Sequence, residues 1–171
     1  MGLLLIEQAF NGLQFGVMLF LIAAGLTLVF GIMDLVNLSH GSLVMVGAYL
    51  ATTLIEWTGS FILGILLALP STFLVGVVVE IVVLRTLYER DHLDQVLATF
   101  GLILFFNELI RIVWGPASLY SGLPESISGH VEILPGVPYP AFRLLIILVG
   151  LLVALLTVSY THLTLPTIRE V

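Results

Sequence analysis

The sequence predicts an all-α integral membrane protein with about five transmembrane helices, and three observations support this fold class. Hydrophobic residues make up 60% of the chain and charged residues only 9%, against about 25% in ordinary soluble domains. The mean hydropathy is +1.20. The uncharged residues are gathered in runs that match the ~20 residues a helix needs to cross a bilayer. The lipid bilayer is therefore the expected environment of the chain.

The first two expected spans are residues 8–33 and 35–55. They are uncharged runs of 26 and 21 residues, separated by Asp34. Gly12 and Gly16 in the first run have the GxxxG spacing that allows another helix to approach closely.

Three further spans are expected at residues 58–84, 93–114 and 141–158. Pro70 lies inside the first of these. Because proline lacks a backbone N–H and its ring clashes with the preceding turn, we expect a kink or a break there.

Two loops set the expected orientation. Residues 84–94 include Arg85 and Arg90, which favours the cytoplasmic side by the positive-inside rule. Residues 115–140 contain no Arg or Lys, so this loop is expected on the opposite side. Alternation of the spans then places the N-terminus outside, provided that the first and second spans both cross the bilayer fully.

A short hairpin is expected within the second loop, near residues 131–139. Pro135 presets φ for a turn and Gly136 can supply the positive φ that such a turn needs. Extended segments are expected on both sides of the turn.

The candidate functional site is a polar segment where the first two apolar runs meet. A polar group without a partner costs several kcal/mol in hydrocarbon, so this segment must be buried in protein or line a wet cavity. The alternative is a helix that starts near Gly41, with Asn37 or Ser39 as its cap. The residues proposed for the site are Asn37, Ser39, His40, Gly41 and Gly47.

One ion pair is expected on the fourth span. Glu108 and Arg111 are three residues apart and share a helical face, where they can pair and reduce the cost of burying either charge. We interpret this pair as structural.

Several function classes are excluded by composition and motifs. Five basic against eleven acidic residues leave no basic patch for nucleic acid. The chain has no cysteine, no GxxxxGK[ST] loop, no H-E-x-x-H and no G-x-S-x-G motif. The sequence therefore predicts no enzyme activity, no cofactor and no metal site.

A family resemblance appears between Gly25 and Leu50. The order GLTLVFG, then N-x-S-H-G, then M-V-G-A-Y resembles the first part of LivH-type permeases, which are membrane subunits of ABC importers for branched-chain amino acids. The resemblance extends from about Phe10 to about Leu156. It implies a multi-pass permease subunit of the bacterial inner membrane, in which the polar segment lines part of the translocation path.

The resemblance also implies partners. These are a LivM-like second permease, two cytoplasmic ABC ATPase subunits, and a periplasmic or lipoprotein amino-acid-binding protein. Two alternatives stay open: a urea or short-chain amide permease of the same family, whose polar segment is very similar, and an intramembrane enzyme or scaffold protein.

The last residues differ from the rest of the chain. Residues 158–171 turn polar, contain Pro166 and resemble the translated adapter tails of metagenomic reading frames. On this interpretation residues 1–157 are a partial transmembrane permease domain, the front half of a larger permease, and residues 158–171 are a non-native tail. An ordinary cytoplasmic tail is the alternative.

Overall fold

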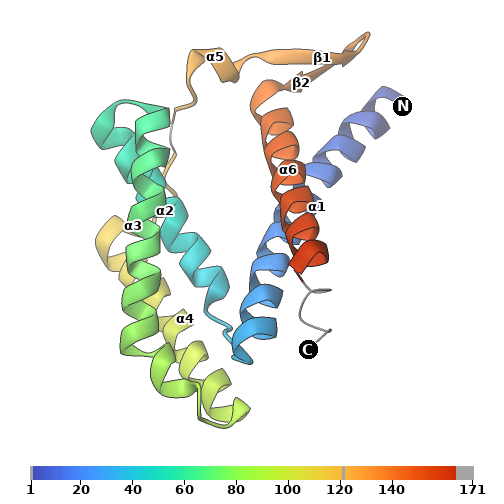
Figure 1. Cartoon of the computed structure of the whole chain (residues 1–171). Helices are drawn as coiled ribbons and strands as arrows, with labels where there is room; N and C mark the ends of the chain where they lie inside the picture. The colour runs from blue at the N-terminus through green and yellow to red at the C-terminus, as the bar shows by residue number, and fades with distance from the viewer. Residues whose placement is uncertain (1, 121, 165–171) are drawn as a thin grey trace. The chain divides into compact units, whose positions relative to one another are not determined.

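The structure is a computed structural model that describes residues 2–120 and 122–164. At residues 32, 33, 126 and 160–164 it describes the backbone alone. Five long helices dominate the described residues (Figure 1). The long helices are α1 (Gly2–Met33), α2 (His40–Thr58), α3 (Phe61–Val82), α4 (His92–Trp114) and α6 (Ala141–Thr164). The shorter elements are η1 (Leu84–Leu87), α5 (Glu125–Ser128), β1 (His130–Leu134) and β2 (Val137–Pro140). The predicted all-α class is confirmed. Helix α6 continues through residues 158–164 of the predicted tail, past the expected end of the fifth span, and residues 165–171 lie outside the described residues.

Four helices of the described chain are long and apolar enough to cross a bilayer. They cover Gly2–Gly31, Phe61–Val82, His92–Trp114 and Ala141–Ser159. A long helix lies in each of the five expected spans, and α2 is the one that does not meet this criterion of length and hydropathy. Residues 34–39 of the expected second span are not helical, and α2 itself carries polar side chains such as Tyr49 and Glu56.

Two other features of the helices differ from expectation. Helix α1 begins at Gly2, before the expected position 8, because the charge of Glu7 ends the uncharged run but does not end a helix. Helix α3 runs through Pro70 without a break, so of the two expected outcomes the break does not occur. Membrane helices tolerate proline where neighbouring groups satisfy the freed backbone.

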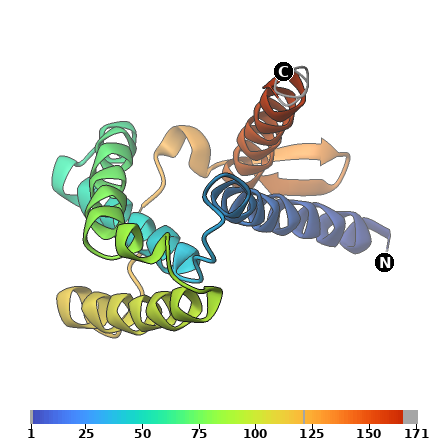
Figure 2. The same ribbon diagram turned by 60° about the horizontal axis from the view of Figure 1, so that its bottom comes forward.

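The chain divides into two compact units, which are described separately. The first contains residues 1–25 and 124–171, and the second contains residues 26–123. In the first unit β1 and β2 form the predicted antiparallel hairpin, which lies beside the start of α6 (Figure 2). Gly136 has a φ of +85°, as the predicted turn requires.

The hairpin of the first unit is anchored on α1 and α6. The Tyr139 side chain is fully buried, and its ring lies 5.6 Å from that of Phe10. Its hydroxyl donates to Asn11 Oδ1 at 3.2 Å, and Arg143 Nη1 donates to the same oxygen at 2.7 Å. Asn11 therefore joins the start of α1, the end of β2 and the start of α6.

Helices α1 and α6 approach each other at Gly150. A Cβ atom at this position would overlap the Val17 side chain. Gly12 and Gly16 have open space around them and line an apolar groove of 410 Å³. Within this unit, the close contact between two helices is therefore at Gly150 and not at Gly12 and Gly16.

The second unit is built around α2, which packs along α3 and α4 (Figure 1). Its core also includes side chains from η1 and from the segment before α2. The buried members are Leu35, Val46, Val79, Leu84, Leu87, Phe106 and Ile110. Residues 34–39 are thus fixed to the same core as the helices.

The turn between α2 and α3 gives a first testable prediction. A Cβ atom on Gly64 would lie 2.6 Å from Ile55 Cα, so Gly64→Ala forces the two helices apart. We expect a loss of about 1–3 kcal/mol in the free energy of unfolding, as for other overpacked cores. Thermal unfolding in detergent measures it. The matched control is Gly76→Ala on the same helix, where no atom lies within 4 Å; equal stability of the two variants would contradict the packing.

Candidate functional site

The candidate site lies where the chain leaves α1. Asp34 ends the helix with a φ of +50°, a left-handed conformation that Asp tolerates better than most residues, and its N–H donates to Phe30 O at 2.9 Å. Residues 34–39, called the linker from here on, are not helical. Helix α2 then begins at His40.

Asn37 shapes the end of the linker. Its Oδ1 accepts the Ser39 N–H at 3.0 Å and the Ser39 hydroxyl at 2.6 Å. Both residues are buried, with Asn37 4% exposed. Ser39 occupies the N-cap position, but its side chain makes no capping hydrogen bond. Asn37 therefore organises the turn before α2, which agrees with the alternative in which this residue serves the start of the helix.

The backbone of the linker is held by two side chains of α4. The Val36 N–H donates to Gln95 Oε1 at 3.0 Å, and the Leu38 N–H donates to Thr99 Oγ1 at 3.3 Å. Gln95 is 2% exposed and Thr99 fully buried. Non-helical backbone in an apolar setting needs such partners, because no water replaces them.

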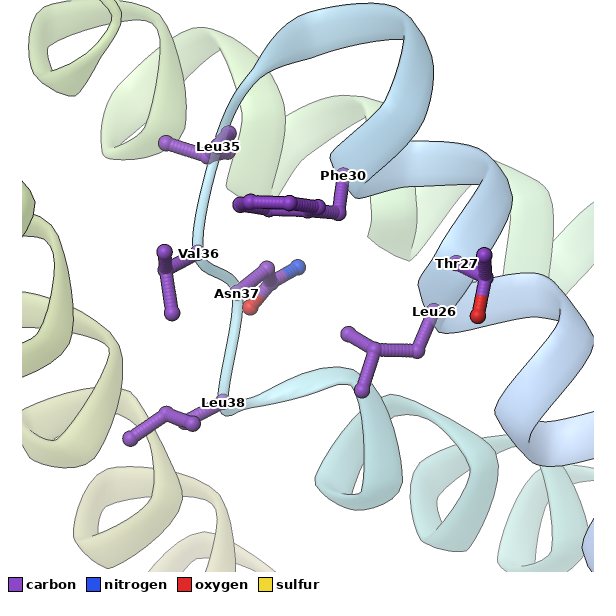
Figure 3. A pocket seen from close by; sticks show the side chains of 7 residues that line it. All are labelled: Leu26, Thr27, Phe30, Leu35, Val36, Asn37 and Leu38. Atoms are coloured by element: carbon purple, nitrogen blue, oxygen red, sulfur yellow. The ribbon is translucent and has the colours of Figure 1, made fainter.

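A pocket of 260 Å³ opens between the linker and the last turns of α1 (Figure 3). Seven residues line it: Leu26, Thr27, Phe30, Leu35, Val36, Asn37 and Leu38. Its walls are mainly apolar. Figure 3 shows the Asn37 side-chain nitrogen turned away from the linker into this space, and the described residues supply no acceptor for it. The pocket can therefore hold a small apolar solute that offers one hydrogen-bond acceptor, such as a carboxylate oxygen.

The structure brings only one of the five predicted site residues into the pocket lining, namely Asn37. His40 is partly buried at the first position of α2, and Gly41 has open space around it. Gly47 lies against α3, where a Cβ atom would meet Thr72 Cγ2 at 3.1 Å. The pathway roles of these residues stay predictions.

The predicted partners Glu108 and Arg111 lie away from the pocket. Arg111 Nη1 is 3.7 Å from Glu108 Oε1, and both side chains are about two-thirds exposed. A pair of this kind contributes little to stability in water. Within the described residues, no group of three or more His, Asp or Glu is placed to hold a metal ion.

Sequence reasoning missed Gln95 and Thr99. They are four residues apart, so they share a face at the start of α4, and two polar groups on one face of an apolar helix signal a partner. The partners are backbone groups 59 and 61 residues away. Spacing along the chain therefore shows the need for a contact but not where it is made.

Comparison with known proteins identifies the family. Residues 8–165 match the family described as branched-chain amino acid transport system / permease component. The chain belongs to this family. The match ends inside the predicted tail of residues 158–171, so the boundary at residue 157 stays a prediction. No solved structure matches significantly.

Curated members of the family are similar over part of their length. The chain is 31% identical to the high-affinity branched-chain amino acid transport system permease protein BraD of Pseudomonas aeruginosa, over 63% of this chain and 38% of BraD. It is 27% identical to LivH of Escherichia coli K12, over 74% of this chain and 45% of LivH. It is also 27% identical to LivH of Salmonella typhimurium, over 73% of this chain and 43% of that LivH.

The chain thus spans less than half the length of the curated relatives it matches. Family membership and the four apolar helices identify a multi-pass protein of the inner membrane. The relatives are transport permeases, a class of protein that is not enzymatic.

Proposed function

We propose that the complete protein is a permease subunit of an ABC importer and that the linker lines part of its substrate path. The pocket beside the linker is the observation that carries this proposal. It combines non-helical backbone with mainly apolar walls and a buried amide donor, Asn37, that has no protein acceptor among the described residues. Membrane proteins retain broken helices of this kind where they line a cavity.

The proposed substrates are branched-chain amino acids. The names of the relatives support this choice, and so do the pocket's aliphatic and aromatic walls, which suit an aliphatic side chain. Urea or a short-chain amide, the alternative substrates, would find one donor but little else to replace its hydration.

The proposed partners are a LivM-like second permease, two cytoplasmic ABC ATPase subunits, and a periplasmic or lipoprotein binding protein. The sequence has no nucleotide-binding loop of its own, so the energy for transport is assigned to the ATPases. The subunit itself is proposed to carry out no enzymatic step.

Uptake of radiolabelled leucine into vesicles that contain the complete protein and these partners tests the function. We expect uptake that depends on ATP and is competed by isoleucine and valine. Competition by urea or acetamide, with leucine uptake absent, would assign the alternative substrates. No uptake of either class would contradict a transport function.

His40→Leu separates a pathway role from a structural role. If His40 lines the path, we expect lower uptake per assembled complex, because the change removes a polar group from the start of α2. If His40 serves only packing, the amount of folded protein should fall and the normalised uptake should remain. Uptake normalised to assembled complex in vesicles measures the difference, and an unchanged value would end the pathway assignment of His40.

A further inference from the structure

Three separate segments meet at one carboxamide, the side chain of Gln95. Its Oε1 accepts the linker's Val36 N–H at 3.0 Å. Its Nε2 donates to Leu87 O of η1 and to Arg90 O of the following turn, each at 3.2 Å. Both Nε2 hydrogens and Oε1 therefore have partners, with His92 Nδ1 a further 3.4 Å contact of Oε1, although the residue is almost completely buried.

These contacts fix the part of the linker that lines the pocket. The Val36 and Leu38 N–H groups bond to side chains of α4 and not to a helical or sheet neighbour. The Thr99 hydroxyl accepts from Leu38 and donates to the backbone Gln95 O at 2.7 Å, which fixes the Thr99 side chain against its own helix. Without them, the Val36 and Leu38 N–H groups would lose these partners in an apolar setting.

Gln95 Nε2 contacts the loop of residues 83–91, which is itself held by buried side chains and a hydrogen bond. Leu84 and Leu87 are buried in the core, and the Tyr88 hydroxyl donates to Glu80 Oε1 at 3.1 Å. Burial is the larger cause and this hydrogen bond the smaller cause that raise the pKa of Tyr88 above its ordinary value. Residues 83–91 are therefore a defined element whose carbonyls Gln95 can hold.

We propose that Gln95 is a positioning residue that sets the conformation of the pocket-lining linker and ties it to the loop of residues 83–91. The effect on transport rests on the proposed function, whereas the effect on the linker does not. A shift of the loop against α4 would break the two Nε2 hydrogen bonds and release the amide that holds Val36.

A thiol at position 36 tests the linker directly. The sequence contains no cysteine, so Val36→Cys introduces the single thiol of this part of the protein, at a half-buried position whose N–H contact is kept. In the complete, folded protein we expect Gln95→Leu to raise the rate at which a small maleimide labels this thiol about fivefold or more, the factor for losing one net hydrogen bond. Mass spectrometry of the peptide containing position 36 gives the rate.

The controls separate positioning from general loosening. Asn107→Leu makes the same polar-to-apolar change at an exposed position of α4 and should leave the labelling rate unchanged. If Gln95→Leu does not fold, Thr99→Val replaces it, and Thr99→Ser, which keeps the hydroxyl, should restore the slow rate. An unchanged rate in Gln95→Leu, or in Thr99→Val, would overturn the proposal.

Transport kinetics provide the second readout. We expect Gln95→Leu to raise the KM for uptake per assembled complex as the linker loses its fixed shape. Faster labelling with unchanged KM would keep the positioning role and remove the pocket from the substrate path. Lower protein yield with unchanged labelling and unchanged KM would show a purely structural glutamine and contradict the proposal.

Discussion

Tyr139→Ala is expected to lower the free energy of unfolding of the first unit by about 3–5 kcal/mol, the range for removing a large buried aromatic side chain. Tyr139 is fully buried, packs on Phe10 and donates to Asn11. Its loss leaves a cavity between the hairpin and α1. Thermal or denaturant unfolding in detergent measures the effect.

The matched control is Tyr139→Phe, which keeps the ring and removes only the hydroxyl. We expect it to cost about 0.5–1.5 kcal/mol, because Asn11 Oδ1 retains the shorter hydrogen bond from Arg143. If Tyr139→Ala were as stable as Tyr139→Phe, the hairpin would not be held by this side chain.

Asn37→Asp is expected to reduce uptake per assembled complex about tenfold or more while the protein still folds. The aspartate keeps the oxygen that accepts both hydrogen bonds from Ser39, so the turn before α2 is preserved. It replaces the amide donor in the pocket by a second acceptor, which repels a substrate carboxylate. Loss of one hydrogen bond to a charged group is about 1.5–3 kcal/mol, or tenfold and more.

Asn37→Leu makes the complementary change. It removes the acceptor for Ser39 as well, so we expect both the yield of folded protein and the uptake to fall. The two variants are compared by size-exclusion yield and by uptake normalised to assembled complex. Normal uptake in Asn37→Asp would assign Asn37 to the turn alone.

Much of the fold could be predicted because its signals are local. Runs of apolar residues mark the long helices, and Pro135 with Gly136 marks the hairpin turn, where Gly136 has the required positive φ. Helix α2 was harder to predict. The apolar residues from 35 to 55 predict a full span, but residues 34–39 form the non-helical linker. The helix that remains, His40–Thr58, does not meet the criterion of length and hydropathy for a span.

The candidate site could be predicted only in part. The need to satisfy polar groups in lipid pointed to residues 34–42, and Asn37 does line the pocket. The partners that hold the linker, Gln95 and Thr99, could not be predicted because they meet it through backbone groups about 60 residues away. Gly47 shows the same limit, since its neighbour Thr72 comes from another helix.

The central claim is that the pocket beside the linker lies on the substrate path. A thiol introduced at the pocket-lining position Leu38 tests it most directly, because Leu38→Cys can be labelled in the assembled importer with and without transport. The control is Trp57→Cys, at the far end of α2 and outside the pocket, where the side chain is 81% exposed.

Labelling rates are measured in vesicles with the binding protein, with and without leucine and ATP. We expect leucine under transport conditions to slow labelling at position 38 and to leave position 57 unchanged, because passing substrate occupies the pocket. Equal rates with and without leucine at position 38, in vesicles that do take up leucine, would contradict the account and place the path elsewhere.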